Sequence, residues 1–84
     1  MAGTVHTLAY QDLLSALIRQ RVQARLSQAA LAEKIGKPPS FVGKYELGER
    51  RLDTIELLVI LKAMDLKFAD FWGASNVQLP TSLK

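Results

Sequence analysis

Two consecutive prolines, Pro38 and Pro39, restrict the fold of this chain more than any other feature of its sequence. Proline fits the first turn of a helix, where its missing N–H would be unpaired anyway, but it disrupts a helix interior. The residue before a proline also tends to be extended, so the pair sets a firm helix boundary. With Gly36 as a helix stop just ahead, the prolines predict a tight turn between a helix that ends at Ile35 and a helix that starts at Pro39.

The rest of the sequence has the period of helices, and no segment alternates like a strand. Ser27 is a favourable N-cap for the helix ahead of the prolines. Asp53 and Glu56 make an acidic capping box at the start of the most apolar helix, which we expect at the centre of the fold. The predicted helices are about 10–24, 28–35, 39–46, 54–64 and 67–72. Together they predict an all-α fold, a compact bundle of four to five helices.

Length and hydropathy suit one small domain. The chain has 84 residues, 49% of them hydrophobic, which is enough for a modest core. We expect a flexible N-terminal segment over 1–9, the folded domain over 10–72, and a C-terminal tail over 73–84 that is either disordered or part of a dimer interface. The longest apolar run, 57–61, is far shorter than the ~20 residues that span a membrane. We therefore expect a cytoplasmic protein without a membrane partner.

The residue types leave little room for chemistry. There is no cysteine, and the single histidine, His6, lies near the N-terminus. Without thiolates or further imidazoles, neither a zinc site nor a Cys or His nucleophile is available. The eight carboxylates are spread along the chain, without a pair placed for acid–base chemistry. We expect no catalytic residue, no metal and no cofactor, and hence no enzyme.

Positive charge is concentrated in the first part of the chain. Residues 1–52 carry eight Lys or Arg against four acidic residues, whereas residues 53–84 carry three against four. Such a basic half suits a polyanionic partner. Two short helices joined by a tight turn, 28–35 and 39–46, also have the dimensions of a helix-turn-helix, whose second helix enters the major groove. Double-stranded DNA is therefore the expected partner.

A resemblance to a known family lies in the stretch LSQAALAEKIGKPPSFVGKYELGERRLDTIELLVILKAM. It is similar to the Cro/CI or XRE-type helix-turn-helix DNA-binding domains, from about Arg21 to Leu66. The matching residues are Ser27 and Gln28 at the start of the second helix, Leu31 and Ala32 at the helix contact, Gly36 in the turn, Val42 in the core, and Glu46 and Gly48 at the end of the third helix. Arg25 departs from the pattern, because a glycine is usual there. The resemblance implies a lambda-repressor-like fold and a sequence-specific transcriptional repressor that binds a palindromic operator as a homodimer.

Carried over by position, the resemblance implies two sets of DNA contacts. Base edges would be contacted by Pro39, Ser40, Phe41 and Lys44. Phosphates would be contacted by Gln28, Lys37, Arg50 and Arg51. Lys44 could donate to guanine and Phe41 could touch a thymine methyl group, but Pro39 supplies no donor where the family often has an amide or arginine side chain. We therefore expect specificity to depend on Lys44, Ser40 and DNA shape.

The resemblance also implies an ion pair between Arg21 and Glu46 that joins the first helix to the third. Phe68, Phe71 and Trp72 either cover the core or form the homodimer interface, and we favour the interface. Small domains of this type resemble phage repressors, restriction-modification controller proteins and antitoxins, and all three remain open. The alternative function is a protein-interaction module, such as an antitoxin, whose main partner is a toxin or another regulator.

Overall fold

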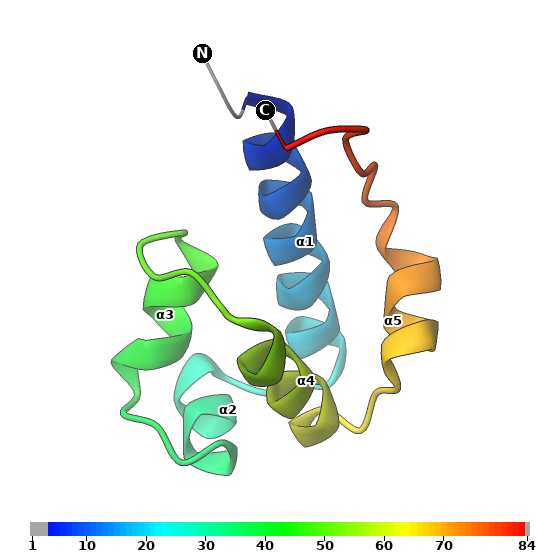
Figure 1. Ribbon diagram of the computed structural model, residues 1–84. Coiled ribbons are helices and arrows are strands. Elements are labelled where there is room, and N and C mark those ends of the chain that lie inside the picture. The colour runs from blue at the N-terminus through cyan, green and yellow to red at the C-terminus, as the bar shows by residue number, and fades with distance from the viewer. Residues whose placement is uncertain (1–3, 84) are drawn as a thin grey trace.

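The computed structural model describes residues 4–83 and folds them into five α-helices without a strand (Figure 1). The helices are α1 (Thr4–Gln23), α2 (Gln28–Lys34), α3 (Ser40–Glu46), α4 (Thr54–Ala63) and α5 (Phe68–Ser75). The predicted all-α bundle is confirmed, and the turn at Pro38 and Pro39 separates α2 from α3. No helix in this described part is long and apolar enough to cross a membrane.

Two helices are longer than the sequence predicts. α1 begins at Thr4 rather than near Tyr10, so residues 4–9, expected in a flexible segment, are helical. α5 continues past Trp72 to Ser75. Packing explains the first difference, because Ala9 is buried and the C-terminal tail lies against this end of α1.

Each of the first four helices ends in a Schellman motif, in which one residue adopts the left-handed conformation and the next N–H bonds back into the last turn. The left-handed residues are Arg25 (φ 59°), Gly36 (φ 73°), Gly48 (φ 82°) and Asp65 (φ 60°). The N···O distances are 3.2 Å from Leu26 to Arg21 and 2.9 Å from Lys37 to Ala32, Glu49 to Lys44 and Leu66 to Leu61. Glycine adopts this conformation without steric cost, whereas Arg25 does not.

Side chains fix the start of two helices. Ser27 Oγ accepts a hydrogen bond from the N–H of Ala30 at 3.0 Å. Asp53 and Glu56 form the predicted capping box, with N···O distances of 2.7 and 3.0 Å between each backbone N–H and the other carboxylate. α3 has no side-chain cap and begins instead after Pro39, whose φ of −54° is already helical.

One hydrophobic core is shared by all five helices. Its largest fully buried side chains are Tyr45, Phe71, Leu17, Leu31, Ile60, Leu61 and Val42. Phe71 is only 1% exposed, so the prediction that it lies at a dimer interface is corrected to a place in the core. The expected central position of α4 is also wrong, because only Ile60 and Leu61 of this helix are buried.

The C-terminal tail returns along α1 (Figure 1). Asn76 ends α5 in the left-handed conformation, and Arg19 Nη2 donates to the carbonyl of Ser75 at 3.5 Å. Between the tail and α1 lies an apolar hollow of about 350 Å³, lined by Ala9, Tyr10, Leu13, Trp72, Val77, Leu79, Pro80 and Leu83. The tail is thus packed against the bundle, and its part in a dimer interface remains a prediction.

We predict that Arg25→Gly stabilises the protein. A left-handed conformation costs an L-residue roughly 1–2 kcal/mol, and glycine avoids that cost while losing more backbone entropy on folding, so we expect a net gain of about 1 kcal/mol. Urea unfolding measures it, with Arg25→Ala as the control, since alanine keeps the Cβ and gains nothing. A less stable glycine variant would show that contacts of the Arg25 side chain outweigh the strain.

Candidate nucleic-acid interface

The carboxylate of Glu46 joins the two helices of the helix-turn-helix to α1. Arg21 binds it through two hydrogen bonds, Nε to Oε2 at 2.7 Å and Nη2 to Oε1 at 3.2 Å. A third Arg21 nitrogen, Nη1, donates to the carbonyl of Leu26 at 2.8 Å. The side chains of Arg21 and Glu46 are only 13% and 5% exposed, so this is the ion pair expected between the first and third helices. The hydrogen bond to Glu46 raises the pKa of Arg21 above its ordinary value.

Gln28, the first residue of α2, lies across α3. Its Nε2 donates to Glu46 Oε1 at 2.8 Å. The amide lies beside Gly43, where a Cβ would be 3.4 Å from Gln28 Oε1 and so in ordinary contact with it. The bond to Glu46 uses one of the two Nε2 hydrogens, and the other is available to a phosphate. Gln28 therefore remains a candidate phosphate contact, now in a fixed position.

α3 has a buried and an exposed face. Val42 and Tyr45 are fully buried, as predicted. Phe41 is also buried, at 8% exposure, and meets the Tyr45 ring edge-on with 5.8 Å between centroids. The predicted contact of Phe41 with a thymine methyl group is therefore wrong, because residues four apart share one face of a helix and Tyr45 faces the core. Pro39, Ser40 and Lys44 are exposed.

Arg50, predicted to contact a phosphate, forms an ion pair with another side chain of the same domain while staying 40% exposed. Its Nη1 and Nη2 bind the two carboxylate oxygens of Glu56 at 2.9 and 2.7 Å. The guanidinium also lies over the Phe41 ring, 4.7 Å from its centroid. Much of the Arg50 charge is thus balanced by Glu56, and its hydrogen bonds attach the loop after α3 to the start of α4.

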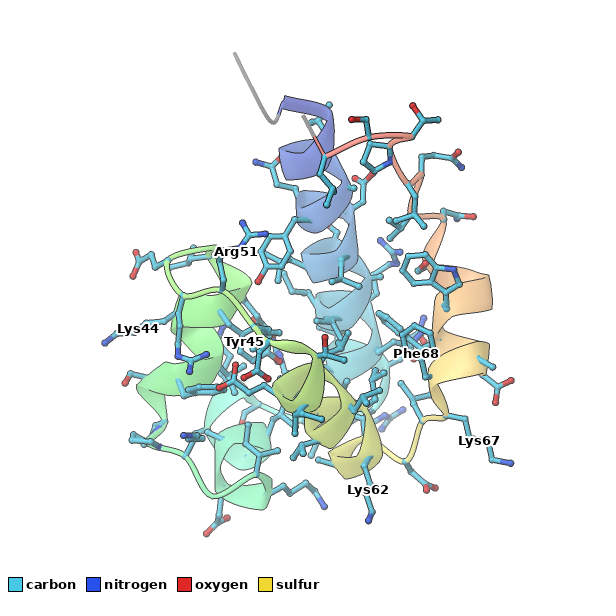
Figure 2. The ribbon with its side chains drawn as sticks, in the orientation of Figure 1. Lys44, Tyr45, Arg51, Lys62, Lys67 and Phe68 are labelled. Carbon is cyan, nitrogen blue, oxygen red and sulfur yellow. The ribbon has the colours of Figure 1, made fainter. Side chains whose placement is uncertain are left out.

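Lys37 and Arg51, the other predicted phosphate contacts from the turn and loop, are exposed. Lys37 Nζ lies 5.4 Å from the Phe41 centroid, and Arg51 Cζ lies 4.2 Å from the centroid of the Tyr10 ring. Lys44 points away from the molecule beside α3 (Figure 2). Lys37 and Lys44 lie on the turn and on α3, whereas Arg51 lies against α1. Neither Lys37 nor Arg51 has an ion pair with an acidic side chain within the described residues.

Two residues that support this surface were missed from the sequence. Glu56 gave a signal only as a capping residue, and nothing in its spacing indicated the pair with Arg50. Tyr10 supports the loop as well, since its hydroxyl accepts a hydrogen bond from the N–H of Leu52 at 3.0 Å. Among the residues that the structure describes, no three His, Cys, Asp or Glu side chains are grouped to hold a metal ion.

Comparison with known proteins agrees with this geometry. Residues 17–71 match the helix-turn-helix family. A solved structure, described as an XRE-family like protein from Pseudomonas syringae pv. tomato str. DC3000, superposes with a TM-score of 0.82 at 35% sequence identity. The match covers 92% of this chain and 94% of that one. No curated protein matches the chain.

We predict that Glu46→Gln destabilises the fold by about 2 kcal/mol, the typical value of a hydrogen bond to a charged group. The substitution leaves Arg21 largely buried with a neutral partner. Thermal and urea unfolding measure the loss. Glu49→Gln is the matched control, because Glu49 follows α3 closely but is exposed. Equal stability of both variants would contradict a structural role for the Glu46 carboxylate.

We predict that Glu56 titrates far below an ordinary glutamate. Hydrogen bonds from Arg50 and from the Asp53 backbone lower its pKa from 4.5 to about 2. Since the folded pKa lies below the unfolded one, the contribution of this pair to stability is complete above about pH 4.5 and is lost as the pH falls toward 2. Carboxyl NMR shifts measure the midpoint.

Arg50→Gln tests the cause of this shift. It should move the Glu56 midpoint upward toward 4.5, while the backbone bond from Asp53 keeps part of the shift. A wild-type midpoint near 4.5, or a midpoint that Arg50→Gln leaves in place, would contradict the bidentate pair.

Proposed function

The chain belongs to the XRE-type helix-turn-helix family of DNA-binding transcription regulators, and on that premise we propose that it is a repressor that binds a palindromic operator as a homodimer. α3 is the recognition helix that enters the major groove. Occupation of the operator prevents transcription from the neighbouring promoter.

The observation that carries this proposal is the division of α3 into two faces. Phe41, Val42 and Tyr45 anchor the helix in the core, and the Glu46 ion pair fixes its end to α1. Pro39 at the N-cap, and Ser40 and Lys44 on the seven-residue helix itself, are left exposed. An α-helix with its side chains is about 10–12 Å across, which fits a major groove about 12 Å wide.

Base recognition rests on a small set of groups. Lys44 donates to guanine O6 and N7, and Ser40 donates or accepts according to the base it meets. Pro39 has no side-chain donor, so direct recognition at the first turn is limited. Sequence-dependent shape and bending of the DNA then contribute a larger share of specificity.

Phosphate contacts hold the domain in register. Gln28 lies at one edge of the helix-turn-helix, and Lys37 and Arg51 lie on the turn and on the loop after α3. Arg50 acts mainly through its pair with Glu56, which holds the loop that carries Arg51. Because each neutralised phosphate releases counterions, affinity falls as salt rises.

The experiment that tests this function is selection of bound duplexes from a random DNA pool, followed by sequencing. We expect an enriched palindrome with half-sites about one DNA turn, ~34 Å, apart. Salt-sensitive binding without any enriched sequence would overturn the proposed function.

We predict that Lys44→Ala weakens binding to the selected operator about 10- to 100-fold and relaxes the preference at one base pair of each half-site, since a good base contact is worth ~1–3 kcal/mol. Lys67→Ala, an exposed lysine at the start of α5, is the matched control and should change affinity little. Binding isotherms on operator and scrambled DNA measure both effects. Equal losses for the two variants would contradict recognition through α3.

A protein-interaction module remains a second candidate, favoured by exposed Ile55, Leu58 and Val59 on α4. Lys44→Glu separates the two functions. If the protein is a repressor, the substitution should abolish operator binding. If the domain is a protein-interaction module, the substitution should leave binding of its protein partner intact.

A further inference from the structure

The outward face of α4 carries an exposed apolar stripe. Ile55, Leu58 and Val59 are 67%, 40% and 45% exposed, and their spacing of three and four residues places them on one side of the helix. Apolar side chains gathered on one exposed face commonly mark an association surface. We call this surface the α4 stripe.

A hollow borders the α4 stripe on the side of the α2–α3 turn. It has a volume of about 230 Å³ and is lined by Ile35, Lys37, Phe41, Ile55, Glu56, Val59 and Ile60. Ile55 and Val59 of the stripe form one wall of this hollow, whose lining is mostly apolar but includes the charged Lys37 and Glu56. This is what a two-fold contact requires, because each copy must offer both the projection and the place that receives it.

The charges along α4 fit a second copy as well. Asp53 lies at its N-terminal end and Lys62 in its last turn. When two α4 helices pack antiparallel across a two-fold axis, Lys62 of each copy approaches the Asp53 end of the other, and the helix dipoles also oppose each other. The middle of the stripe, at Leu58 and Val59, then lies next to the axis.

The position of α4 leaves the outer face of α3 free, although Lys37, a proposed phosphate contact, lines the neighbouring hollow. α4 lies in front of the bundle in Figure 1, while α3 forms its left edge, and Lys44 projects away from α4 in Figure 2. A copy docked on the α4 stripe therefore leaves the outer face of α3 uncovered in both subunits.

The aromatic residues of α5 fit this role less well. Phe71 is in the core, and Trp72 is half-buried and lines the hollow under the tail. Phe68 is 44% exposed, but it stacks on Trp72 with 5.8 Å between ring centroids and is the one strongly exposed aromatic residue of α5.

We propose that the α4 stripe, with its neighbouring hollow, is the homodimer interface, and that two copies pair through antiparallel α4 helices about an axis at Leu58 and Val59. The inference rests on the proposed function for its role in operator binding. The interface itself is tested without DNA.

Single cysteines provide the first test, because the chain has none of its own. Val59→Cys should form a covalent dimer under mild oxidation, since the two side chains meet near the axis. Leu79→Cys, in the tail that borders the α1 hollow and 68% exposed, is the control and should stay monomeric on a denaturing gel. Cross-linking of Leu79→Cys but not of Val59→Cys would overturn the proposal in favour of the tail.

Sedimentation in the absence of DNA provides the second test. Val59→Lys should weaken dimerisation about tenfold or more, as expected for a charge at the centre of an interface, whereas Leu79→Lys should leave it unchanged. An unchanged helical CD spectrum and melting temperature show that Val59→Lys is folded. A wild-type chain that is monomeric at micromolar concentration, or a Val59→Lys variant that dimerises normally, overturns the interface.

The outcomes separate the interface from the function. If Val59→Lys disrupts the dimer but the protein selects no DNA sequence, the proposed interface stands and the proposed repressor function is wrong. If the protein is a monomer that selects a single half-site, the proposed interface is wrong and DNA recognition stands. If the protein is a monomer and binds a different protein through Val59, the homodimer interface is wrong and the α4 stripe binds that protein instead.

Discussion

The carboxylate of Glu46 is the point at which three helices meet, and the position of α3 depends on it. Arg21 from α1 and Gln28 from α2 both donate to its oxygens, so the last residue of α3 is fixed from two sides. The inner face of α3 is held by apolar packing, to which Arg50 adds a contact over the Phe41 ring. A seven-residue helix is too short to be stable by itself. Its conformation and orientation therefore depend on these contacts. Its outer face is not needed to hold the helix and is available to a partner.

Side-chain contacts also hold the loop after α3 in place. Arg50 pairs with Glu56, lies over the ring of Phe41, and so connects the loop, the core of α3 and the first turn of α4. Glu56 also closes the capping box of α4. The basic character of this region is thus partly structural, and the charges that remain outward, on Lys37, Lys44 and Arg51, are fewer than a count of basic residues suggests.

α4 presents a different balance. On one side of this helix, Ile60 and Leu61 are buried in the core. On the other side, the α4 stripe is exposed to solvent. In a monomer that exposed surface contributes nothing to folding, so its energetic value depends on association. Recognition through α3 and pairing through α4 would then use separate sides of a domain of only 84 residues.

The sequence by itself determined the local elements, because their signals lie within a few residues of one another. The prolines and Gly36 fixed the turn between α2 and α3, the Asp53–Glu56 box fixed the start of α4, and the family pattern predicted the Arg21–Glu46 pair. Tertiary structure decided which side of each apolar helix is buried. Phe41 and Phe71 are in the core and the α4 stripe is outside, and periodicity cannot distinguish two apolar faces of one helix. The pairing of Arg50 with Glu56 and the extension of α1 to Thr4 also depend on partners brought close only by folding.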